Sequence, residues 1–470
     1  MTDSPWQKAG TDEPVPNREP GISTVQVRTA ERSVCPWFLR PAAKPKFVVL
    51  AVLSAAAVYA GLDGSYVLPL DHPAIQYGAP PDDPAAKLDQ RLASGQAKLA
   101  YDPVLGYLPA LLRELQLPLS SQVVVFSKTS FQAPRISPWN PRALYFSDDT
   151  SVGYVYGGEV LEIASVDPRQ GVIFYTLDQE KTAKPRIVRR GECLQCHQGG
   201  GTLGVPGLVV RSVYPESSGM PLFQAGGFVT DHRSPIKNRW GGWFVTGKSE
   251  PHMGNAFVDD RDHPEALGSG QTANLADLTK KFNTAHYLTP YSDAVALMVL
   301  EHQTRMTNLL TRVNYETRLA LHDQAVIDKA LGRSGEQLSE STQSRIKNAT
   351  DTLLEYMLFA DEAPLNAPVQ GSTNFAAEYQ KRGPCSKRGM SLRDLDLKTR
   401  LLRYPCSPLI YSEAFDALPA PAKDRIYRRL WEILSGKDDS KTYARLSQAD
   451  RGNILEILRD TKPGLPDYWK

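Results

Sequence analysis

The chain has 470 residues, of which 41% are hydrophobic and 23% are charged, and its 54 basic and 52 acidic side chains leave a net charge of +2. This composition excludes a wholly disordered chain, and a single long apolar run excludes a protein that crosses a membrane many times. The near balance of charge gives no electrostatic case for nucleic acid as a partner.

The N-terminal region divides into a polar tail and an apolar segment. Residues 1–46 are rich in proline and show no apolar periodicity, so we expect a disordered cytoplasmic tail. Residues 47–63 contain an uncharged run of 16 residues, and Arg40, Lys44 and Lys46 precede it. A span needs about 20 residues, so the run fits either a transmembrane anchor or a cleaved signal, and we favour the anchor. The cations before it predict that the rest of the chain lies in the periplasm or another extracytoplasmic space.

The remaining residues predict an α+β fold in two parts. Residues 64–84 are rich in proline and aspartate and are expected to be a linker. Residues 85–270 read as a β-rich domain with a leading helix, and residues 271–470 as a mainly helical domain. We expect strands at 122–126, 143–146, 153–156, 160–163, 172–175, 207–213 and 240–246. We expect helices at 294–321, 343–359, 414–434 and 447–458.

The β-rich part carries the pentapeptide Cys-Leu-Gln-Cys-His, formed by Cys193, Cys196 and His197 with two residues between the cysteines. This spacing is the attachment signature of haem c, in which two thiols add to the two vinyl groups of one porphyrin and the adjacent imidazole becomes the proximal ligand of the iron. With five Cys and eight His in the chain, chance produces the pattern only about 0.001 times. The alternatives are a redox-active dithiol and half of a zinc site, but no second Cys-x-x-Cys or His-x₃-His completes a zinc site. We therefore expect one covalently attached haem c.

Through Cys193, Cys196 and His197 the chain resembles c-type cytochromes. The segments 240–247, Trp-Gly-Gly-Trp-Phe-Val-Thr-Gly, and 460–469, Asp-Thr-Lys-Pro-Gly-Leu-Pro-Asp-Tyr-Trp, resemble those of large, uncharacterised single-haem cytochromes of bacteria. The small cytochrome c domain is helical and has its motif near the start, whereas here the motif follows a β-rich stretch. The resemblance therefore gives a class and no reaction.

The sixth ligand of the iron decides what such a haem does, because axial ligands move its potential over about 0.8 V. Met253 and His252 are the preferred candidates, since both lie in a glycine-containing loop soon after a predicted strand. His232 lies close to the motif in sequence, and His302 and Met306 are spaced to share one helix face. An open sixth position is the alternative to all of them.

These observations lead to three hypotheses of function. The first is a membrane-anchored, extracytoplasmic cytochrome that transfers electrons between an unidentified donor and acceptor protein. The second is a haem enzyme whose open iron site acts on a small oxidant. The third is a haem-based sensing or interaction module. We favour an electron carrier over a catalyst, and the sequence names no catalytic residue.

Two further groups of residues, the arginines before the motif and two later cysteines, allow predictions. Arg186, Arg189 and Arg190 precede the motif, and one of them is a candidate partner for a haem propionate. Cys385 and Cys406 lie in the part that we expect to be exported, where a disulfide between them would stabilise the fold by about 3 kcal/mol. Two free thiols are the alternative.

Overall fold

The computed structural model describes residues 66–264, 267, 274–334 and 337–469, which belong to one compact unit, Leu62–Lys470. The predicted tail (1–46) and apolar segment (47–63) lie outside the described residues. Within the described ranges, no helix combines the length and hydropathy that crossing a membrane requires.

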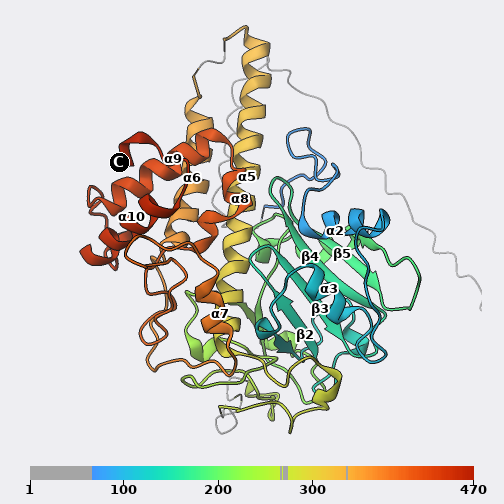
Figure 1. The fold of residues 1–470 in the computed structure, drawn as a ribbon. Coiled ribbons are helices and arrows are strands. Elements are labelled where there is room, and N and C mark those ends of the chain that lie inside the picture. Colours follow the sequence, from blue (N-terminus) through green and yellow to red (C-terminus); the bar gives the residue numbers. More distant parts are fainter. Residues whose placement is uncertain (1–65, 265–266, 268–273, 335–336, 470) are drawn as a thin grey trace, which may run out of the picture. The chain divides into compact units, whose positions relative to one another are not determined.

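An antiparallel sheet of seven strands occupies the middle of the sequence (Figure 1). Its strands are β1 (Val123–Val125), β2 (Arg142–Phe146), β3 (Thr150–Val155), β4 (Val160–Asp167), β5 (Gly171–Asp178), β6 (Ile187–Arg189) and β9 (Trp243–Phe244), in the order β6-β5-β4-β3-β2-β1-β9. The strands expected at 143–146 and 153–156 pair as the hairpin β2–β3, and those expected at 160–163 and 172–175 pair as the hairpin β4–β5. The second closes at the Asp167–Gly171 pair, where Gly171 adopts a φ of +76° that glycine accommodates without strain.

Two predicted strands are much shorter than expected. Of residues 207–213 only β7 (Arg211–Val213) is extended, and it pairs with β8 (Gly227–Val229) in a separate two-stranded sheet. Of residues 240–246 only β9 remains, because Trp240 and Gly242 have φ values of +69° and +87°, which interrupt an extended backbone.

One face of the sheet is covered by the helices α2 (Pro84–Ala93) and α3 (Leu108–Glu114), whose leucines pack on β4 and β5. We expected residues 64–84 to form a linker, but from residue 66 onward they join this core. Leu68, Ile75 and Tyr77 are buried in it. The prediction failed because these apolar residues follow no helix or strand period and pack one by one against distant elements.

The later part of the unit is mainly helical, as predicted. Its helices are α5 (Ala294–Leu331), α6 (Glu340–Met357), α7 (Phe375–Lys381), α8 (Glu413–Asp416), α9 (Ala420–Leu434) and α10 (Gln448–Thr461). The 38-residue α5 is capped at its start by the Asp293 carboxylate and at its end by Gly332 in the left-handed region. The helix expected at 447–458 is α10, and a capping box between Ser447 and Asp450 forms its start.

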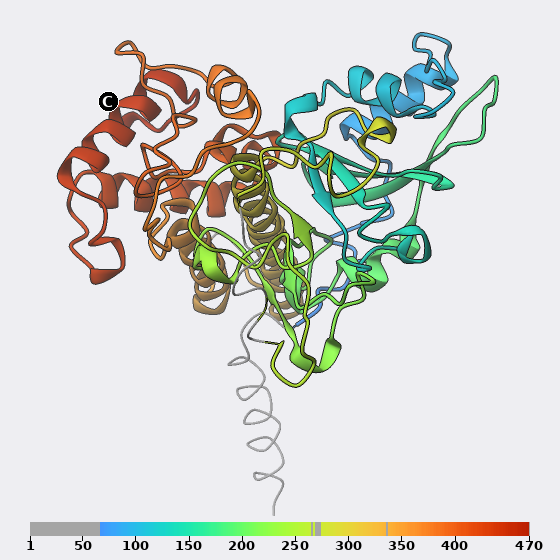
Figure 2. The ribbon, with the colours of Figure 1, turned by 90° about the horizontal axis from the view of Figure 1, so that it is seen from below.

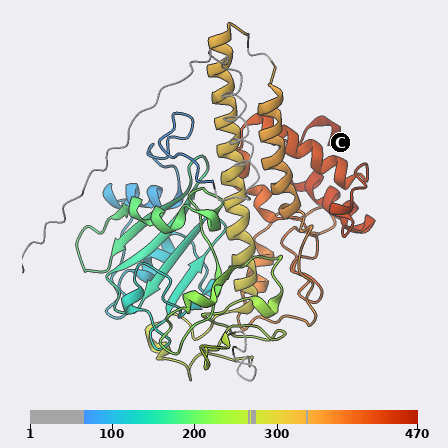
Figure 3. The ribbon, with the colours of Figure 1, turned by 180° about the vertical axis from the view of Figure 1, so that it is seen from behind.

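Helix α5 runs between the sheet and the other helices (Figures 2 and 3). Its first turns, Ala294–Leu300, pack against residues of β1 and β9, and the stretch from Met306 to Val313 belongs to the core formed with α6, α9 and α10. A helix buried on most of its circumference needs apolar residues all around, which explains its weak amphipathic pattern. The fold is therefore α+β, with α5 shared by both parts.

Candidate functional site

The cysteine–histidine motif forms a short helical turn. Gly191–Cys193 make one 3₁₀ turn that continues into α4 (Leu194–His197). Cys193 is half-buried and Cys196 is exposed, and both thiols are free. Positions i, i+3 and i+4 of a helical turn share one face, so the two thiols and the His197 imidazole project from the same side.

This turn packs on the face of the sheet opposite to α2 and α3. Because side chains alternate along a strand, Ile173 and Tyr175 of β5 point toward α2 and α3, while Val172 and Phe174 point toward the motif. Cys193 and Leu194 pack against this second, smaller apolar cluster. The ring centroids of Phe174 and His197 lie 4.6 Å apart. The motif thus rests on a small apolar patch of the sheet.

The His197 ring is oriented by a backbone carbonyl. Its Nδ1 lies 3.0 Å from the carbonyl oxygen of Gly207, and the Gly207 N–H donates to the His197 carbonyl at 2.9 Å. A ring that donates from Nδ1 carries its lone pair on Nε2, and burial of the ring lowers the pKa of His197, which favours the neutral form. A neutral imidazole whose second nitrogen donates to a carbonyl is the usual state of a metal ligand.

Leu208, the residue after Gly207, is held by Asn308, a buried residue of α5. The Asn308 amide accepts from the Leu208 N–H at 3.1 Å and donates to the Leu208 carbonyl at 2.7 Å. A Cβ atom at position 207 would lie within 3.0 Å of Asn308 Oδ1, so only glycine fits here without a shift. Sequence reasoning missed both residues. The one available signal was an asparagine inside an apolar helix, since a buried amide requires hydrogen-bond partners.

Charged side chains continue the same face of the sheet beside the apolar patch. Glu162 is the cross-strand neighbour of Thr176 and forms an ion pair with Arg142. Gly153 lies beneath this pair, and a Cβ there would be 2.5 Å from Arg142 Nη2. Burial and the nearby Glu192 and Glu162 carboxylates raise the pKa of Cys193. The motif therefore packs on apolar side chains of the sheet, with charged side chains beside them.

The three arginines before the motif differ in their surroundings. Arg186 makes a bidentate ion pair with Asp89, at 2.9 and 2.6 Å. Arg189 donates to backbone carbonyls of the segment that precedes α2. Arg190 donates from Nε to the Thr176 hydroxyl at 2.8 Å, and its guanidinium is partly exposed. Its Nη1 lies 3.9 Å from the carboxylate of Glu192, so Arg190 is the member of the three that lies beside the motif.

The two preferred sixth-ligand candidates are buried and have other partners. The Met253 sulfur accepts a hydrogen bond from the Ser212 hydroxyl at 3.4 Å. His252 Nδ1 accepts from the Gly254 N–H at 2.9 Å, and burial lowers the pKa of His252 to about 4. Ser212 and Arg211 project to opposite faces of β7, and Arg211 is the one that approaches the glycines after the motif. Met253 would have to leave Ser212 to reach the motif, and its role as a ligand stays a prediction.

The other candidates lie deep in the fold. His232 and His302 are fully buried, and their Nδ1 atoms are 2.8 Å apart. The second ring nitrogen of His302 bonds the Ser407 hydroxyl at 2.8 Å, and burial lowers the pKa of His302 to about 3. Met306 belongs to the core among the helices. These contacts give each side chain a structural role.

Cys385 and Cys406 are not joined. Cys385 is exposed and Cys406 is buried, and both thiols are free in the structure. Of the two alternatives left open by the sequence, the structure contains the pair of free thiols.

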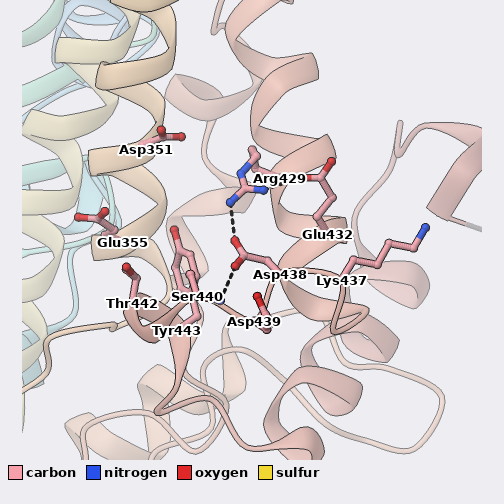
Figure 4. A pocket seen from close by; sticks show the side chains of 10 residues that line it. All are labelled: Asp351, Glu355, Arg429, Glu432, Lys437, Asp438, Asp439, Ser440, Thr442 and Tyr443. Atoms are coloured by element: carbon pink, nitrogen blue, oxygen red, sulfur yellow. Dashed lines mark hydrogen bonds and ion pairs between the residues drawn. The ribbon is translucent and has the colours of Figure 1, made fainter.

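An open pocket of about 600 Å³ lies in the helical part, between α6, α9 and the loop that follows α9 (Figure 4). Its lining is charged, and Arg429 pairs with both Glu432 and Asp438 at 2.5 Å. Asp351 is paired with Lys347 and Arg425. The lining residues include neither cysteine nor histidine. The pocket therefore adds nothing to the chemistry of the motif.

The chain was compared with protein-family models, with curated proteins and with solved structures, and none of the three comparisons gives a match. The site therefore has to be interpreted from its own geometry. That geometry consists of two free thiols and one oriented imidazole on one helical turn, which packs on apolar side chains of the sheet and has an arginine at its side.

Proposed function

We propose that this chain is a c-type cytochrome with one haem, attached through Cys193 and Cys196 and ligated by His197. The observation that supports this most is the hydrogen bond from His197 Nδ1 to the Gly207 carbonyl. It leaves the Nε2 lone pair of the neutral ring available to a metal ion. A dithiol enzyme has no need of a histidine oriented in this way, whereas an iron ligand does.

The surrounding residues fit such a group. Cys196 is exposed and Cys193 is half-buried, so both sulfurs are accessible for thioether formation. Phe174 and the neighbouring apolar residues offer contact to a flat hydrophobic ring, and Arg190 offers a cation for a propionate. When bound, the haem would supply one-electron redox chemistry, and Gly207 and Asn308 would keep its ligand His197 in place.

The proposed activity is electron transfer between two redox proteins outside the cytoplasm. It follows from the class of site and from the sequence of residues 47–63, whose lack of charge and preceding cations favour a membrane anchor. No partner is identified by the geometry.

The test is covalent haem attachment in a host that has a haem-attachment system. After denaturation in alkaline pyridine, the full chain should retain a c-type spectrum, with one haem per chain. Cys193→Ser and Cys196→Ser should each lower the covalent haem at least several-fold, and Cys385→Ser, which removes another exposed thiol, should leave it unchanged. A denatured chain without haem, or equal loss in all three variants, would refute the proposal.

An open iron site is the second candidate, and one observation favours it. The preferred sixth ligands Met253 and His252 are buried, and each already accepts a hydrogen bond, from Ser212 and Gly254. Carbon monoxide separates the two activities. Immediate binding by the reduced, haem-loaded chain would favour a ligand-binding enzyme, and resistance to carbon monoxide would favour the electron carrier.

A further inference from the structure

Three potential metal ligands meet away from the motif, at the far half of α5. His72 belongs to the segment before α2, and His322 and Asp323 are neighbours on α5. One ligand atom from each lies within 4.8 Å of the others. The two imidazole rings meet edge to face, with their centroids 4.7 Å apart. We propose that these three residues bind a divalent transition metal of the Zn²⁺ class.

The histidine nitrogens are suited to this role. His322 Nδ1 is inaccessible to solvent and has no hydrogen-bond partner among the described residues. Its neighbour at 3.9 Å is the Asp323 carboxylate oxygen Oδ1. A buried ring nitrogen without a partner is uncommon, and a bound cation would satisfy it.

His72 offers its lone pair at Nδ1. This atom accepts the Ala74 N–H at 3.1 Å, so in the neutral ring Nε2 carries the proton. A metal ion would take the Nδ1 lone pair in place of that hydrogen bond. The cost is small, because the Ala74 N–H lies in a partly exposed segment and can turn to water.

The carboxylate of Asp323 is already oriented. Arg345 binds its other oxygen, Oδ2, at 2.7 Å and also contacts Glu316 at 3.2 Å. Oδ1 therefore remains directed toward His322. An outer partner that fixes a ligating carboxylate in this way is typical of metal sites, and the Glu316 charge offsets that of Arg345.

The spacing fits an ion after a small movement. Tetrahedral Zn²⁺ at 2.0–2.1 Å from each ligand sets the ligand atoms about 3.3 Å apart, so these side chains must close by about 1 Å. The His322 side chain is 36% exposed and can adjust its ring, while Asp323 keeps its bond to Arg345 through Oδ2; water can take the fourth position. A bound metal ion would link the segment around His72 to α5.

The test is a calorimetric titration of the full chain with Zn²⁺, after its accessible thiols have been alkylated. We expect one equivalent to bind, and affinity at least 10-fold lower in His72→Ala and in His322→Ala. His286→Ala, which removes a histidine that stacks on Tyr156, is the matched control and should bind as the wild type does. Melting in metal-free buffer checks that each variant folds.

Two results would overturn the site. One is the absence of heat up to about 1 mM Zn²⁺, which corresponds to only about 4 kcal/mol of binding. The other is unchanged affinity in both histidine variants, which would assign any bound zinc elsewhere. Neither result bears on the proposed haem, because the titration uses no haem signal.

Discussion

Gly207 is the point where the loop that orients His197 meets α5, and replacing it with alanine tests the arrangement of the site. A methyl group there would lie within 3.0 Å of Asn308 Oδ1 and close to the Thr202 side chain. Asn308 is 1% exposed and is fixed by two hydrogen bonds to Leu208, so it has little room to move. The backbone at 207 is not in the left-handed region, so the cost comes from crowding and not from conformation.

The magnitude follows from two contributions. Overpacking a well-packed interior costs about 1–3 kcal/mol. If Asn308 moves aside, its hydrogen bonds to Leu208 weaken, at about 1 kcal/mol each. Gly207→Ala should therefore lower the free energy of unfolding by about 2–4 kcal/mol, measured by chemical denaturation of the full chain.

The same loop supplies the control. Gly199 has extended backbone, and a Cβ there would meet nothing within 4 Å. Gly199→Ala should change stability by no more than about 0.5 kcal/mol. If Gly207→Ala is as stable as Gly199→Ala, the contact with Asn308 does not position the loop, and the support that we assign to His197 is wrong.

A double-mutant cycle identifies the source of the cost. Asn308→Ala removes the atom that the new methyl group would meet, at the expense of the two hydrogen bonds to Leu208. If crowding against Asn308 dominates, the double variant should be less destabilised than the sum of the single variants, by about 1–2 kcal/mol. Strict additivity would place the clash elsewhere, for example at Thr202.

Three further predictions concern the rest of the unit. Burial raises the pKa of Glu362 from 4.5 to about 7, so the folded chain holds an extra proton between these values and stability falls as the pH rises through them. Glu362→Gln keeps the acceptor for the Leu401 N–H. Its free energy of unfolding should therefore rise by about 2–3 kcal/mol relative to that of the wild type as the pH goes from 5 to 8. A difference in chemical denaturation that does not change with pH would contradict this. Iodoacetamide should label exposed Cys385 in the native chain and Cys406 only after unfolding, because burial raises the pKa of the Cys406 thiol to about 12; mass spectrometry that finds both labelled equally in the native chain would contradict the burial. Ser447→Ala removes the N-cap of α10 and should lower the unfolding free energy by about 1 kcal/mol, and an unchanged denaturation midpoint would show that the cap contributes nothing.

The elements that the sequence predicted well are those defined by local patterns. The β4–β5 hairpin follows from apolar runs on either side of Asp167–Gly171, and α10 follows from its capping box. The strand expected at 240–246 failed for a non-local reason. A Cβ at Gly241 would lie within 3.0 Å of the Val213 carbonyl, so the chain bends where it passes β7. The pattern of tryptophans and glycines does not reveal that neighbour.

The candidate site shows the same division. Cys193, Cys196 and His197 form a local signature on one helical turn, at the spacing that shares a helix face. Gly207 and Asn308, which orient the histidine, come from a later loop and from α5. Their roles depend on which segments meet in space, and no spacing within the sequence encodes that meeting.

Helix α5 connects the two proposed sites and also separates them. Asn308 supports the loop of the proposed haem site, and His322 belongs to the proposed metal site. Fourteen residues of helix place these two positions about 21 Å apart along its axis. Sites at that distance without shared partners influence stability independently, to within about 0.5 kcal/mol. The segment around His72 reaches α5 at the metal cluster, whereas the motif reaches it through Gly207. The experiments on the haem and on the metal therefore probe different contacts of the same helix. If one proposal fails, the other is unaffected.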